Sequence, residues 1–88
     1  MKLKYDFIVN EVAGQFVAVA VGDGVEAFSG FVKMNDIGAE IFEILKNDVT
    51  ADEVIAKMLE KHPESNLEEA TEAVNGFIAG LNKEGILA

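Results

Sequence analysis

The chain has no cysteine and no tryptophan among its 88 residues, and proline and histidine occur once each. Without cysteine, disulfides, thiol nucleophiles and thiolate metal sites are excluded, so the fold depends on packing alone. The one histidine, His62, stands at a predicted helix end, where it can interact with the helix C-terminus. A histidine-based metal or catalytic site needs further partners, and the sequence shows none. We therefore expect no catalytic residue, no cofactor site and no metal site, and hence no enzyme.

Positive charge is also scarce, because 7 lysines face 16 acidic residues and give a net charge of −9. A field of that sign repels phosphate backbones and anionic lipids, and no basic cluster offsets it locally. The N-terminal segment has no apolar run of the length that a signal peptide or a membrane span requires, since Asp6, Asn10 and Glu11 interrupt it. We expect a cytoplasmic protein with neither nucleic acid nor membrane as its partner.

Half of the residues are hydrophobic, which suits one globular domain over residues 1–88. Three segments alternate or are rich in β-branched and aromatic residues, and they predict strands over Tyr5–Val9, Phe16–Val21 and Val25–Met34. Residues 10–14 and 22–24 contain glycine and predict the turns between them. Strands joined this closely form an antiparallel meander, which needs helices on one face to be stable.

Helical spacing of apolar residues begins at Asn35, a good N-cap, and predicts a first helix to about Lys46. Thr50 and Glu53 form a capping box for a second helix that ends before Pro63. A third helix runs from Asn66 to a C-cap at Gly85. The expected class is α+β, a winged-helix-like domain with a three-stranded antiparallel sheet followed by a three-helix bundle.

Small residues in the helices indicate close approaches. Gly38 lies in the first turn of the first helix, where close packing against the preceding strand would explain it. Ala73, Gly76 and Gly80 fall on one strip of the third helix, although glycine costs about 1 kcal/mol relative to alanine there. The strip allows another backbone to approach. That backbone belongs either to the sheet of the domain or to a peptide in an open groove.

The order of these motifs resembles the family of the pyrroloquinoline-quinone biosynthesis protein D. The resemblance spans nearly the whole chain and is strongest in the segment from Phe28 to Leu45, which reads Phe28-x-Gly30 and then Met34-Asn35-x-x-Gly38-Ala39-x-Ile41-Phe42-x-x-Leu45. It continues in Thr50-x-x-Glu53-x-Ile55 and in Phe77-x-x-x-Leu81-x-x-x-Gly85-Ile86-Leu87. Members of this family are small domains that bind leader peptides in the synthesis of ribosomally made, post-translationally modified peptides.

The resemblance implies a non-enzymatic peptide chaperone. A leader peptide would add as a strand to the third strand, lie against the third helix, and be presented to a modifying enzyme, often a radical S-adenosylmethionine enzyme. By position, the peptide-binding residues would be Ala27, Phe28, Ser29, Gly30, Phe31 and Val32 of the strand and Ala73, Gly76, Phe77 and Gly80 of the helix.

Two other functions remain open at this point. A winged-helix transcription regulator would need a basic recognition helix, but the second helix offers only Lys57 and Lys61 and the third only Lys83. A generic protein-interaction domain fits the same features as the peptide chaperone. The unpaired edge of the third strand also allows a homodimer formed by edge pairing.

Overall fold

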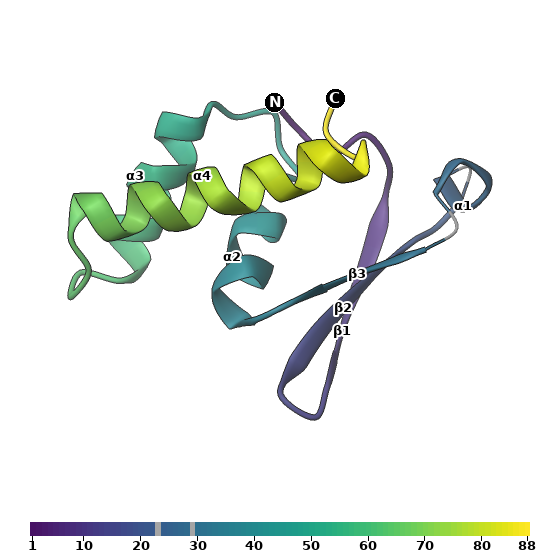
Figure 1. The fold of residues 1–88 in the computed structure, drawn as a ribbon, viewed down its shortest axis with the longest axis horizontal. Helices are drawn as coiled ribbons and strands as arrows, with labels where there is room; N and C mark the ends of the chain where they lie inside the picture. Colours follow the sequence, from purple (N-terminus) through teal and green to yellow (C-terminus); the bar gives the residue numbers. More distant parts are fainter. Residues whose placement is uncertain (23, 29) are drawn as a thin grey trace.

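A three-stranded sheet and a group of helices form the two parts of the domain (Figure 1). The computed structural model describes residues 1–22, 24–28 and 30–88. In chain order the elements are β1 (Phe7–Val12), β2 (Gln15–Ala20), α1 (Gly24–Ala27), β3 (Phe31–Met34), α2 (Asp36–Ile44), α3 (Ala51–Lys61) and α4 (Leu67–Glu84). The expected α+β class and the three-stranded sheet are confirmed. The described chain has four helices instead of three, because α1 adds a single turn before β3.

The sheet is an antiparallel meander in the order β1-β2-β3. Its first hairpin turns at Ala13 and Gly14, which have φ values of 52° and 82°. Two residues with positive φ match the twist of the strands that they join, so the strands pair up to Val12 and Gln15. The prediction that residues 10–14 form the turn was therefore too long, and Asn10 and Glu11 belong to β1.

The prediction of one strand over Val25–Met34 was wrong in its first part. Gly24–Ala27 form α1, in which the Phe28 N–H donates to the Gly24 carbonyl at 2.8 Å. Gly24 packs so closely on Tyr5 that a Cβ there would lie 2.8 Å from the Tyr5 Cβ. The chain turns at this contact and only Phe31–Met34 pair with β2, so β3 is short.

The predicted helix caps are confirmed. Asn35 accepts from the Gly38 N–H at 2.8 Å, and Asn66 accepts from the Glu69 N–H, also at 2.8 Å. Thr50 and Glu53 form the reciprocal capping box, with distances of 3.1 Å and 2.9 Å. Gly85 ends α4 in the left-handed conformation at φ 76°. These local interactions set where each helix begins or ends.

Phe42 lies at the centre of the core. Its side chain is fully buried, and its ring meets the Phe7 ring of β1 at 5.2 Å and the Phe77 ring of α4 at 6.5 Å, both nearly edge to face. Residues from the sheet, α2 and α4 therefore share one aromatic cluster. Aromatic pairs in this arrangement contribute about 0.5–1.5 kcal/mol each beyond their buried area.

The two ends of the chain close the domain beside this core. Leu3 and Leu87 form an antiparallel bridge, and the Lys4 N–H donates to the Ile86 carbonyl at 2.8 Å. Ile86 is fully buried, so the tail after α4 packs back on the core. Figure 1 shows the N- and C-termini side by side at the end of α4.

Removal of the Phe42 ring should lower the free energy of unfolding far more than removal of an exposed ring. We expect Phe42→Ala to cost about 3–5 kcal/mol, because it leaves a cavity in the core. Phe31→Ala should cost at most about 1 kcal/mol, since the Phe31 side chain is 59% exposed on β3. Urea unfolding followed by circular dichroism measures the free energy of unfolding of both variants. Equal losses would contradict the central position of Phe42 in the core.

Candidate functional site

The free edge of β3 is the first part of the candidate site. β3 pairs with β2 through residues Phe31 to Met34, and no described strand pairs with its other edge. An unpaired edge leaves backbone N–H and C=O groups available to a further strand. The side chains alternate: Met34 is buried towards the helices and Val32 is half-buried, whereas Phe31 and Lys33 are exposed on the opposite face.

The small-residue strip of α4 is the second part. Ala73, Gly76 and Gly80 are all exposed. A Cβ built on Gly76 or Gly80 would meet no described atom of another residue within 4 Å, other than atoms of its chain neighbours and its own helix. The sheet of the domain therefore does not approach the two glycines, and the space beside them is open.

A groove of about 330 Å³ lies along this strip. One side is α2 with its N-cap Asn35, and the other is α4. The lining residues are Asn35, Ile37, Gly38, Ile41, Glu72, Ala73, Gly76 and Phe77. Gly38 sets the depth of the groove, because a Cβ there would lie 2.9 Å from the Phe77 ring and 3.1 Å from the Met34 Cβ. The expected close packing of Gly38 on the preceding strand is confirmed, and α4 packs on it as well.

The predicted site residues lie on α4, on β3 and in the segment before β3. Ala73, Gly76 and Phe77 line the groove, and Gly80 extends the same strip by about one turn. On β3, Val32 packs against the core and Phe31 is on the outer face. Before β3, Gly30 is exposed, while Phe28 is half-buried with its ring 5.9 Å from the Phe7 ring. Ser29 and the side chain of Ala27 lie outside the described residues.

Phe28 is therefore partly a packing residue. Its edge-to-face contact with Phe7 holds the segment before β3 against the core.

The groove also includes Asn35, Ile37 and Glu72, which were not predicted from the sequence as site residues. Glu72 lies four residues before Gly76, so the same helical spacing that identified the strip could have identified it.

A second hollow of about 240 Å³ continues from the groove towards the start of α4. It shares Ile37 and Ala73 with the groove and adds apolar side chains such as Met58 and Val74. His62, Glu64 and Glu69 provide most of its polar lining. The whole depression thus runs beside α4, with an apolar floor and an acidic far end.

His62 connects three segments at that far end. Its backbone caps α3, as the sequence suggested, but its ring reaches α2, where Nε2 lies 2.5 Å from the Glu40 Oε2. Nδ1 lies 3.4 Å from the Glu64 Oε1. The hydrogen bond to Glu40 is the main cause that raises the pKa of His62 above 6.5, and partial desolvation opposes it. Protonation of His62 therefore strengthens the connection between α2 and the end of α3.

Among residues 1–22, 24–28 and 30–88, no group of three or more His, Asp or Glu side chains is placed to hold a metal ion. None of the helices in this part of the chain is long and apolar enough to cross a membrane.

Over residues 15–87 the chain matches the family described as coenzyme PQQ synthesis protein D, PqqD. The chain belongs to this family. No curated protein sequence matches it significantly. Its fold is similar to that of a solved structure titled "TbiB1 in Complex with the TbiA(beta) Leader Peptide", with a TM-score of 0.71 and 13% sequence identity. The likeness covers 99% of this chain and 94% of that one, and at this identity it concerns the fold alone.

Replacement of Glu40 by glutamine should lower the pKa of His62, because it removes the carboxylate that stabilises the imidazolium. Nuclear magnetic resonance (NMR) titration of the ring protons measures that shift. Glu43→Gln is the matched control, since Glu43 lies on the same helix as Glu40 but pairs with Lys46.

The pH dependence of stability should follow the same pair. Folding raises the pKa of His62. The stabilisation that the His62–Glu40 pair contributes is therefore fully present below about pH 6.5, the pKa of His62 in the unfolded chain, and is lost as the pH rises through the pKa of His62 in the folded chain. Glu40→Gln should therefore destabilise the domain at about pH 5.5 and have little effect at about pH 8.5. A loss that is the same at both values would contradict the pairing.

Proposed function

We propose that this PqqD-family domain is a non-enzymatic peptide chaperone. It binds the leader segment of a ribosomally made precursor peptide by strand addition to β3 and presents it to a modifying enzyme, of the radical S-adenosylmethionine class. The observation that carries the proposal is that the space beside Gly76 and Gly80 is open, in a domain that also has a free strand edge at β3. Membership of the family and the similar fold of a protein solved with a leader peptide support it.

Strand addition would use the backbone of β3 for affinity. Each intermolecular hydrogen bond contributes about 0.5–1.5 kcal/mol, and the short β3 offers few of them. Side-chain burial in the groove therefore has to supply much of the remaining binding energy. Peptide residues opposite Val32 and Met34 would point to the same face as these two, towards the floor formed by Ile37, Ile41 and Phe77.

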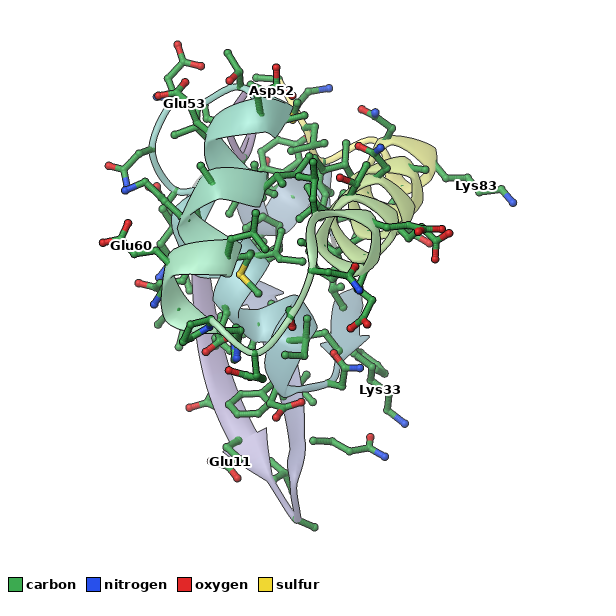
Figure 2. All side chains as sticks on the ribbon, turned by 90° about the vertical axis from the view of Figure 1, so that its left-hand side faces the viewer. Glu11, Lys33, Asp52, Glu53, Glu60 and Lys83 are labelled. Atoms are coloured by element: carbon green, nitrogen blue, oxygen red, sulfur yellow. The ribbon has the colours of Figure 1, made fainter. Side chains whose placement is uncertain are left out.

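The charge around the site is mixed, although the chain is acidic as a whole. Figure 2 shows Lys33 of β3 and Lys83 of α4 projecting on the same side of the molecule, with Glu60 and Glu11 elsewhere. Neither lysine lines the groove, whereas Glu72 does. This pattern suits a peptide better than a nucleic-acid backbone, which a net charge of −9 repels.

Filling the space beside the strip should abolish peptide binding and keep the fold. We expect Gly76→Leu and Gly80→Leu to block the groove, because each new side chain enters space that is empty in the described structure. Both changes remove a helix-interior glycine, so the free energy of unfolding should stay equal or rise by up to about 1 kcal/mol. Asn75→Leu is the matched control, since Asn75 is exposed on the adjacent face of α4.

The binding experiment needs a defined probe. Selection from a displayed library of short random peptides against the immobilised domain, together with candidate precursor leaders, would provide one. Titration of the isotope-labelled domain with the tightest peptide should shift the NMR signals of β3 and of Ala73 to Gly80. Shifts confined to other surfaces, or unchanged affinity in folded Gly76→Leu and Gly80→Leu variants, would overturn the groove assignment.

A further inference from the structure

The face of the sheet that points away from the helices is apolar and exposed. The strand register places Ile8 of β1, Val19 of β2 and Phe31 of β3 in one row across all three strands. Their side chains are 51%, 37% and 59% exposed. Val12 on β1, 61% exposed, and the half-exposed Val17 on β2 belong to the same face. We call these five residues the outer patch.

The outer patch is contiguous. Its residues are adjacent through backbone pairing, whereas single exposed apolar residues are ordinary on any protein surface. The opposite face of the same strands, which includes Phe7, Ala18 and Met34, already packs on the helices. The outer patch is therefore a second apolar face that no described element covers.

The charges of this face permit contact with a second copy. Lys33 is the one charged residue among the paired strand positions that point outward, and Asn10 and Gln15 are its neutral polar members. All 16 acidic side chains of the sequence belong to other positions. Two copies that meet through this face therefore bring no carboxylates into direct opposition, although their net charges still repel at longer range.

The arrangement of the outer patch is self-complementary. A two-fold axis that lies between the copies and runs along the strands exchanges β1 and β3. Ile8 of one copy then meets Phe31 of the other, and Val19 meets its own counterpart near the axis. By the same operation Lys33 meets Asn10, whose side-chain oxygen can accept a hydrogen bond. Sheets packed face to face in this way cross at about 30°.

We infer that the domain forms a homodimer through the outer patch, with the sheets of two copies packed face to face. This dimer differs from edge pairing, because it leaves the free edge of β3 and the groove beside α4 open in both copies. It also does not depend on the proposed function, since self-association requires no peptide.

Sedimentation equilibrium of the peptide-free chain tests the dimer over about 10 μM to 1 mM. The mean mass should rise towards twice that of one chain. Val19→Lys should weaken self-association at least about tenfold, because it places two like charges face to face at the axis. Leu67→Lys is the matched control: it makes the same change of charge at a residue 63% exposed on α4, and its association should equal that of the unchanged chain.

The salt dependence of dimerisation provides a second test. Raising the salt concentration should strengthen dimerisation of the unchanged chain, because it screens the repulsion between two chains of charge −9. A chain that stays monomeric over the whole range at high salt would overturn the inference. A dimer that Val19→Lys and Leu67→Lys affect equally would also overturn it, since the contact would then lie on another surface.

Discussion

The absence of a side chain at Gly38 is the constraint on which the rest of the structure depends. At this point the start of α2 meets both Met34 of β3 and the ring of Phe77 on α4, at distances that leave no room for a Cβ. Because the three elements approach this closely, Phe42 lies between rings from the sheet and from α4. The same approach makes Phe77 a wall of the groove. The close packing at Gly38 thus contributes both to the core and to the shape of the candidate site.

Most of the fold could be predicted from local sequence signals. The caps at Asn35, Thr50, Asn66 and Gly85 act within a few residues, so their side-chain chemistry alone indicates where the helices begin or end. The segment before β3 was not predictable in this way. Its alternating residues are typical of a strand, but Gly24 packs on Tyr5, which is distant in sequence, and a helical turn forms there instead.

The candidate site was predictable in its composition but not in its openness. Helical spacing placed Ala73, Gly76 and Gly80 on one strip, and the same reasoning could have added Glu72. Whether the strip is covered depends on how α4 is rotated about its axis, and packing of Val74, Ile78 and Leu81 in the core determines that rotation. The contact between His62 and Glu40 joins positions 22 residues apart, so it needed the tertiary structure.

The paired ends of the chain have a consequence for how this domain can be combined with others. Residues near both termini bond to each other, through Leu3 with Leu87 and through Lys2 with Ala88 at 2.8 Å. A short linker could therefore join the ends, and new ends could open at the exposed turn of Ala13 and Gly14 without crossing the core. The domain is geometrically suited to circular permutation, and to insertion as a unit into a surface loop of a larger protein.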